Sequence, residues 1–101
     1  MDCPLCALPS ELTLWEDERC RVIRVDDAAH PGFCRVVWGE HVAEMTDLSP
    51  ADRRHLLDVV MATEAALRNL LDPDKINLAS FGNMVPHLHW HVIPRYRDDR
   101  H

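Results

Sequence analysis

Three histidines alternate with apolar residues near the end of the chain, at positions 87, 89 and 91. Successive side chains point to opposite faces of a β-strand, so a strand over residues 85–93 places His87, His89 and His91 on one face. The apolar residues between them then lie on the other face, which suits packing in a core. Three neutral imidazoles carry six ring nitrogens that need partners, so they are costly as core filling. The pattern therefore predicts a face that does chemistry.

The spacing of these histidines favours one reactive imidazole over a shared metal ion. Alternate residues of a strand lie about 6.7 Å apart, which separates His87 from His91 by about 13 Å. Zinc–nitrogen bonds measure about 2.0–2.1 Å, so one ion bound by all three is strained, although two neighbours could share one. In a relay, one imidazole reacts and its neighbours fix its tautomer through the other ring nitrogen. His89, with a partner on each side, is the expected nucleophile.

The four cysteines fall into two groups. Cys20 and Cys34 lie within apolar runs and are expected to be buried as free thiols, because a cytosolic chain keeps its thiols reduced. Cys3 and Cys6 form a Cys-x-x-Cys pair, which is the spacing of metal ligands.

The elements that must position these residues follow from the hydrophobic pattern and the turn residues. Strands are expected over residues 11–15, 19–25, 33–38, 76–81 and 85–93. Residues 26–32 predict a loop, and residues 41–48 could hold a short helix. Strands, one long helix and strands again are typical of an α+β domain.

The long helix has clear signals at both ends. Ser49 is a natural N-cap and Pro50 suits the first helical position, while Asp72, which precedes a proline, ends a helix of about twenty residues. Its buried stripe is expected to hold Leu56, Val60, Leu67 and Leu71, with Leu57, Met61 and Leu70 beside them.

Length and charge limit the class of protein. A chain of 101 residues supports one domain. The net charge of −6, without a basic block, makes nucleic-acid polymers poor partners, because these need clustered Lys and Arg. A small phosphorylated ligand remains compatible, since its site can be locally positive. No run approaches the roughly 20 apolar residues that span a bilayer, and no targeting segment is recognisable, so we expect a cytoplasmic protein without membrane contact.

The run His-Leu-His-Trp-His-Val-Ile, residues 87–93, matches the signature His-φ-His-φ-His-φ-φ, in which φ is hydrophobic. On this run the chain resembles the histidine-triad (HIT) superfamily, and within it the bacterial diadenosine polyphosphate hydrolases. Ile76-Asn77-Leu78, Gly82-Asn83 and Ile93-Pro94-Arg95 are also similar to family members. The resemblance predicts a single HIT domain over residues 3–97, followed by a charged tail at 98–101.

The resemblance implies a fold and a reaction. The fold is an antiparallel sheet of about five strands with a helix packed on it, usually paired into a symmetric homodimer. The reaction takes place at the α-phosphate of dinucleoside polyphosphates or nucleoside phosphoramidates. By the same resemblance, His89 forms a nucleotidyl-histidine intermediate that water or another acceptor resolves, and His87 and His91 orient and polarise it.

The resemblance also implies which residues bind the substrate. It places Asn77, Gly82 and Asn83 near the phosphate, and Asp26 or Asp27 at the ribose hydroxyls. Each has a plain alternative, as a residue of a strand end or of a solvated turn.

Some family members hold a structural zinc, and its ligands match Cys3, Cys6, His41 and His87 here. Cys₂His₂ is a closed tetrahedral set typical of structural zinc. The alternative is two terminal thiols beside an unrelated histidine. No cofactor is expected to be required for the chemistry itself.

Two departures from the family pattern concern substrate and rate. Phe33 follows Gly32 where many relatives carry a fourth histidine, and Met84 stands where relatives commonly place Ser or Thr. Two other functions therefore stay open: a nucleotide-binding module with little turnover, and a metal-dependent hydrolase that uses histidines of the triad.

Overall fold

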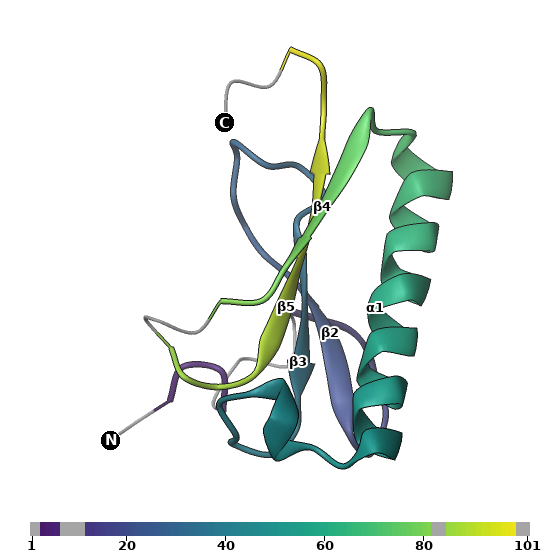
Figure 1. The fold of residues 1–101 in the computed structure, drawn as a ribbon. Coiled ribbons are helices and arrows are strands. Elements are labelled where there is room, and N and C mark those ends of the chain that lie inside the picture. Colours follow the sequence, from purple (N-terminus) through teal and green to yellow (C-terminus); the bar gives the residue numbers. More distant parts are fainter. Residues whose placement is uncertain (1–2, 7–11, 82–84, 99–101) are drawn as a thin grey trace.

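The computed structural model describes residues 3–6, 12–81 and 85–98. In chain order, this part forms β1 (Thr13–Glu16), β2 (Cys20–Arg24), β3 (Cys34–Trp38), the 3₁₀ helix η2 (Met45–Asp47), α1 (Pro50–Leu71), β4 (Lys75–Ala79) and β5 (His89–Arg95) (Figure 1). Within the described residues, no helix combines the length and the apolar character needed to cross a membrane.

The strands form one antiparallel sheet in the order β1-β2-β3-β5-β4. α1 lies along one face of this sheet, and the opposite face is left to the loops and the N-terminal segment (Figure 1). β5 lies between β3 and β4, so its backbone is hydrogen-bonded on both sides. The predicted α+β class, a five-stranded antiparallel sheet with one long helix, is confirmed. The homodimer and the domain boundary stay predictions.

The ends of α1 follow the local signals in the sequence. The Ser49 hydroxyl accepts a hydrogen bond from the backbone N–H of Asp52 at 3.2 Å, and Pro50 opens the helix. Asp72 adopts a left-handed conformation with φ 47°, and its N–H bonds to the carbonyl of Arg68. The cap and this C-terminal turn satisfy backbone groups that a helix end otherwise leaves unpaired.

The predicted buried stripe of α1 is correct in its first half and wrong toward its end. Leu56 and Val60 are fully buried, and Leu67 packs against the same core. Leu71 is 40% exposed, and the three residues placed beside the stripe, Leu57, Met61 and Leu70, are also exposed. The sheet contacts α1 mainly through β3 and β5. The last turn of the helix packs beside Gly32 of the β2–β3 loop, and Leu71 is only partly covered there.

The two faces of the sheet carry different sets of side chains. On the α1 face, Val22, Val36 and Val92 pack with Leu56 and Trp38 in the main core. Cys20 and Cys34 are buried there as free thiols, as predicted. On the opposite face a smaller cluster joins Leu5, Ile23 and Val37. This second cluster fixes the N-terminal segment over the face that carries the histidines.

Gly32 closes the loop between β2 and β3. Its φ of +84° lies in the left-handed region, which glycine adopts without the penalty that a Cβ brings. A Cβ at this position would lie 2.5 Å from Cδ1 of Leu71 and 3.2 Å from Cγ of Pro94. The loop is thereby held close to the C-terminal ends of α1 and β5.

The last strand differs from the prediction in both of its ends. It begins at His89 rather than at residue 85, and it continues through Pro94 to Arg95. Before the strand, the N–H of Leu88 bonds to the carbonyl of Val42 at 2.7 Å, away from the ladder with β3. His87 therefore lies in a bend before the strand rather than within it.

Candidate active site and metal centre

His89 is held at the first position of β5 by a backbone contact. Its Nδ1 lies 2.6 Å from the carbonyl oxygen of His87. A carbonyl oxygen can only accept, so Nδ1 must donate and carry the proton. Nε2 then keeps its lone pair, which is the tautomer a nucleophilic histidine needs. The tautomer is fixed by the main chain of His87 rather than by a neighbouring imidazole, which corrects the predicted relay.

The ring of His87 is directed elsewhere. Its Nε2 lies 2.6 Å from the carbonyl oxygen of Trp38. In an antiparallel ladder a hydrogen-bonded pair exchanges two backbone bonds. Trp38 and Leu88 make only one of these two bonds, in which the Trp38 N–H donates to the Leu88 carbonyl at 3.1 Å. The imidazole of His87 occupies the acceptor that the second bond would use, so its Nδ1 is the nitrogen left with a lone pair.

That lone pair faces the predicted metal ligands. Nδ1 of His87 lies 3.5 Å from Sγ of Cys3 and 3.3 Å from Sγ of Cys6, and Nδ1 of His41 lies 3.4 Å from Sγ of Cys6. One donor atom from each of the four residues lies within 4.8 Å of the others. In a tetrahedral zinc site, bonds of about 2.0–2.3 Å separate sulfur from nitrogen by about 3.6 Å. The donor set and its spacing therefore fit zinc.

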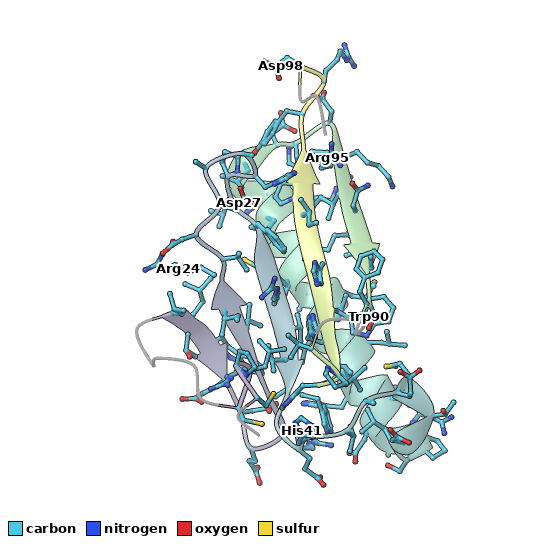
Figure 2. All side chains as sticks on the ribbon, turned by 90° about the vertical axis from the view of Figure 1, so that its left-hand side faces the viewer. Arg24, Asp27, His41, Trp90, Arg95 and Asp98 are labelled. Atoms are coloured by element: carbon cyan, nitrogen blue, oxygen red, sulfur yellow. The ribbon has the colours of Figure 1, made fainter. Side chains whose placement is uncertain are left out.

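The N-terminal segment is anchored independently of this group. The Arg21 guanidinium donates a hydrogen bond to the carbonyl of Leu5, and the Leu5 side chain is buried. Figure 2 views the face of the sheet that is turned away from α1. His41 lies near one end of this face, and Asp27 and Arg95 lie toward the other end.

His91 occupies an aromatic environment next to His89. Its ring centroid lies 5.1 Å from that of His89, 5.4 Å from that of Phe33 and 5.5 Å from that of Phe81. Burial, followed by the positive charge of Arg35 and the proximity of His89, lowers the pKa of His91 to about 4. His91 is therefore neutral near pH 7.

The pKa of His89 is also lowered. Burial is the largest cause, because it disfavours the charged imidazolium. The hydrogen bond to the His87 carbonyl opposes this effect, while the charges of Arg35 and His87 add to it. A neutral His89 keeps its lone pair at neutral pH, as a nucleophilic histidine requires.

Sequence reasoning missed two residues that contact or face this site. The Ser80 hydroxyl donates a hydrogen bond to the carbonyl of His89 at 2.9 Å, which holds the strand from the β4 side. Arg35 lies on β3 directly opposite His91. Arg35 could have been identified as a candidate site residue because it is a cation inside the otherwise apolar run 33–38. Nothing in the sequence points to Ser80.

The residues predicted to bind substrate lie farther along the same face. Asn77 is the β4 partner of Ile93, and its Oδ1 accepts a hydrogen bond from Arg95 at 2.9 Å. Asp26 has an exposed carboxylate paired with Arg24. The predicted residues Gly82 and Asn83, and Met84 beside them, lie outside the described residues.

The loop between β2 and β3 carries an open, shallow hollow of about 610 Å³, lined by residues between 24 and 33 that include Asp26, Asp27 and Phe33. Asp27 is hydrogen-bonded within this loop, to the backbone N–H of Ala29 and to Nδ1 of His30, both at 3.0 Å. The hollow adjoins the histidines through Phe33, whose ring contacts that of His91.

A family model described as the HIT domain matches residues 9–98. The chain belongs to the HIT family. HIT proteins are in general nucleotide hydrolases and transferases that bind small nucleotide ligands. No curated protein matches this chain in sequence.

Solved structures of HIT proteins share this fold. A histidine triad protein from Marinobacter aquaeolei is 31% identical, with 92% of this chain and 72% of that one covered and a TM-score of 0.80. One from Bradyrhizobium japonicum is 28% identical, with 94% and 75% covered and a TM-score of 0.83. One from Sinorhizobium meliloti is 25% identical, with 98% and 77% covered and a TM-score of 0.82.

In this HIT domain, Phe33 is an apolar wall of the site. Its side chain is buried, and its ring meets that of His91 on one side and the edge of His30 at 6.3 Å on the other. The phenyl ring can neither donate a proton nor carry charge. Phe33 therefore supplies no positive charge to the site.

Proposed function

We propose that this HIT protein cleaves nucleotide conjugates at the α-phosphate, with His89 as the nucleophile. The observation that carries the proposal is the 2.6 Å contact between Nδ1 of His89 and the His87 carbonyl, which leaves the Nε2 lone pair available. The substrates are dinucleoside polyphosphates or nucleoside phosphoramidates, and the acceptor is water or another nucleophile.

The chemistry divides into two displacements. In the first, the Nε2 lone pair of His89 forms a bond to the α-phosphorus, and the bond from phosphorus to the leaving oxygen or nitrogen breaks with its electron pair. A leaving nitrogen takes up a proton from water and departs as ammonia or an amine. In the second, water attacks the same phosphorus and loses a proton, and the phosphorus–Nε2 bond breaks to release a nucleoside monophosphate. His89 returns to its starting form.

The His87 carbonyl contributes more in the intermediate than in the resting enzyme. Once Nε2 is bonded to phosphorus, the imidazole of His89 carries a positive charge, and its Nδ1–H becomes a stronger donor. The hydrogen bond to the His87 carbonyl is then charge-assisted, which strengthens it about twofold. An interaction that is stronger in the transition state than in the bound substrate lowers the activation barrier, whereas one that is equally strong in both only tightens binding.

The remaining predicted residues bind the nucleotide in this proposal. Asp26, which lines the hollow of the β2–β3 loop, would accept hydrogen bonds from ribose hydroxyls. Asn77, the β4 partner of Ile93, would bind the phosphate, and Gly82 and Asn83 are assigned to the phosphate by the family resemblance alone. A neutral His91 would donate its ring N–H to a phosphate oxygen or to the leaving group.

We also propose that Cys3, Cys6, His41 and His87 bind a structural zinc ion. Zinc would neutralise the two thiolates and close the N-terminal segment over the sheet. The described donors form a group that contains His87 but neither His89 nor His91. The ion is therefore assigned a role in holding the His87 backbone in place, rather than a role in the chemistry.

The test is turnover of diadenosine tetraphosphate and, separately, of adenosine 5′-phosphoramidate, with AMP as the measured product. We expect wild-type protein to release AMP from at least one of them, and His89→Asn to release none. Binding of both compounds without product would instead identify a nucleotide-binding module. Product formation that His89→Asn retains and chelation abolishes would identify a metal-dependent hydrolase.

A further inference from the structure

We propose that Arg35 binds the phosphate of the nucleotide, through a guanidinium placed beside His91 and over the ring of Phe33. This inference rests on the proposed function and adds to it the side chain that supplies positive charge at the reacting phosphate.

The register of the sheet places Arg35 next to the histidines. Arg35 is the β3 partner of His91, and Val37 is the partner of His89. The Trp38 N–H bonds to the Leu88 carbonyl, and hydrogen-bonded pairs alternate with non-hydrogen-bonded pairs in an antiparallel ladder. Arg35 and His91 therefore form a non-hydrogen-bonded pair, with Cα atoms about 4.5 Å apart and side chains close together on one face.

The guanidinium is partly buried and lacks a charge partner. Its Nε is buried and has no hydrogen-bond partner, and its Cζ lies 5.5 Å from the centroid of the Phe33 ring. Burial lowers the pKa of Arg35, because it disfavours the charged guanidinium. Among residues 3–6, 12–81 and 85–98, no carboxylate forms an ion pair with it.

The neighbouring arginines are engaged elsewhere. Arg21 donates to the carbonyl of Leu5, Arg24 pairs with Asp26, and Arg95 donates to Asn77. Arg35 is thus the cation that faces His91 directly and still has an unsatisfied donor. A partly buried charge without a partner is costly, and an anionic ligand bound beside it would offset that cost.

A phosphate is the anion that fits this position. A guanidinium binds phosphate oxygens through two parallel N–H donors, and its stacking on an aromatic ring fixes the plane of those donors. Phe33 lies under the guanidinium and also lines the 610 Å³ hollow of the β2–β3 loop. A nucleoside in that hollow would have its phosphate beside Arg35 and His91, within reach of the next histidine of β5.

The experiment is calorimetric titration of AMP and of adenosine into wild-type protein, Arg35→Met and Arg35→Lys. AMP is a product of the proposed reaction, so binding is measured without turnover. We expect wild type to bind AMP more tightly than adenosine. Arg35→Met should weaken AMP binding about ten- to a hundredfold and leave adenosine binding unchanged, and Arg35→Lys should restore part of the loss.

The matched control is Arg54→Met, an exposed arginine of α1, which should bind both ligands as wild type does. Equal AMP affinity in wild type and Arg35→Met would overturn the inference, as would an equal loss of AMP and adenosine binding in a variant that melts like wild type. If Arg35→Met fails to fold, Arg35→Gln tests the same loss of charge. Wild-type protein that binds neither ligand would contradict the proposed function itself, which is a different outcome.

Discussion

The carbonyl oxygen of His87 lies 2.6 Å from Nδ1 of His89, while the ring of His87 belongs to the group of donors around Cys3 and Cys6. One residue thus links the candidate metal centre to the proposed nucleophile, through its side chain on one side and its main chain on the other. The link is rigid, because Nε2 of the same ring is bonded to the Trp38 carbonyl. Any change that moves the His87 backbone should alter the tautomer and position of His89.

The first prediction concerns zinc content. Cys6→Ser removes the thiol that lies closest to both histidine donors of the group, so zinc bound per chain should fall from about one to near zero. Elemental analysis of purified protein measures it. Cys34→Ser is the matched control, because this thiol is buried on the α1 face away from the donor group and should leave the zinc content unchanged.

Zinc loss should also affect turnover and stability together. We expect the Cys6→Ser variant to melt at a lower temperature and to have a reduced kcat, because the His87 carbonyl is less well held. The nucleotidyl adduct should still form, although more slowly. Equal zinc content in wild type and Cys6→Ser would contradict the assignment of these ligands.

The second prediction concerns the pH dependence of kcat/KM. An imidazole loses its nucleophilic lone pair when it is protonated, so the rate falls as the pH drops through its pKa. The pKa of His89 is lowered and that of His91 lies at about 4, so the acid limb should lie below pH 6.5. Arg35→Met removes a positive charge that lowers both values, so its acid limb should move toward neutral pH. Arg35→Lys should keep the wild-type position.

A pH–rate profile recorded on the three proteins measures this shift. Identical acid limbs near pH 6.5 in wild type and Arg35→Met would show that Arg35 does not act on the histidines electrostatically.

Local signals predicted the framework of the fold well. Ser49, Pro50 and Asp72 lie within a few residues of the backbone groups that they cap or end, so α1 was predictable at both termini. The Cys-x-x-Cys pair and the triad resemblance likewise predicted the four donors that the structure brings together. The exposure of Leu71 was not predictable, because it depends on how much of the last turn of α1 the β2–β3 loop covers.

The site geometry was less predictable because it depends on long-range contacts. His87 lies before the strand rather than in it, and its ring bonds to the carbonyl of Trp38, 49 residues away in the chain. In the sequence, Arg35 is a single cation within an apolar strand. Only the strand register in the structure shows that it pairs with His91. In each case the partner that determines the residue's environment lies on another strand, so the residues adjacent in the sequence do not predict it.

The third prediction concerns an ion pair between α1 and the β1–β2 turn. Nε2 of His55 lies 2.7 Å from Oδ2 of Asp17, and Oδ1 accepts the backbone N–H groups of Arg19 and Cys20, both at 2.8 Å. Burial raises the pKa of Asp17, but these hydrogen bonds and His55 outweigh it and lower the pKa to about 2 from 3.8. Asp17→Asn should cost about 2 kcal/mol of unfolding free energy at pH 7.

The sign of the pH effect follows from the lowered pKa. The charged Asp17 stabilises the fold fully above the unfolded pKa, and this contribution is lost as the pH falls from about 4 to about 2. Thermal melts of wild type and Asp17→Asn should therefore differ at pH 7 and converge toward pH 2. Asp58→Asn, at an exposed position of α1, is the control and should melt as wild type does. A constant difference between pH 7 and pH 2 would rule out the carboxylate's charge as its cause.

In the proposed reaction, His89 becomes covalently bonded to the nucleotide. The most direct measurement is mass spectrometry of protein quenched during turnover of diadenosine tetraphosphate or adenosine 5′-phosphoramidate, followed by peptide mapping. We predict a wild-type species heavier by one adenylyl group, with the adduct on the peptide containing His89 and absent from His89→Asn. Product release with no adduct at any quench time, or an adduct on another residue, would contradict the account.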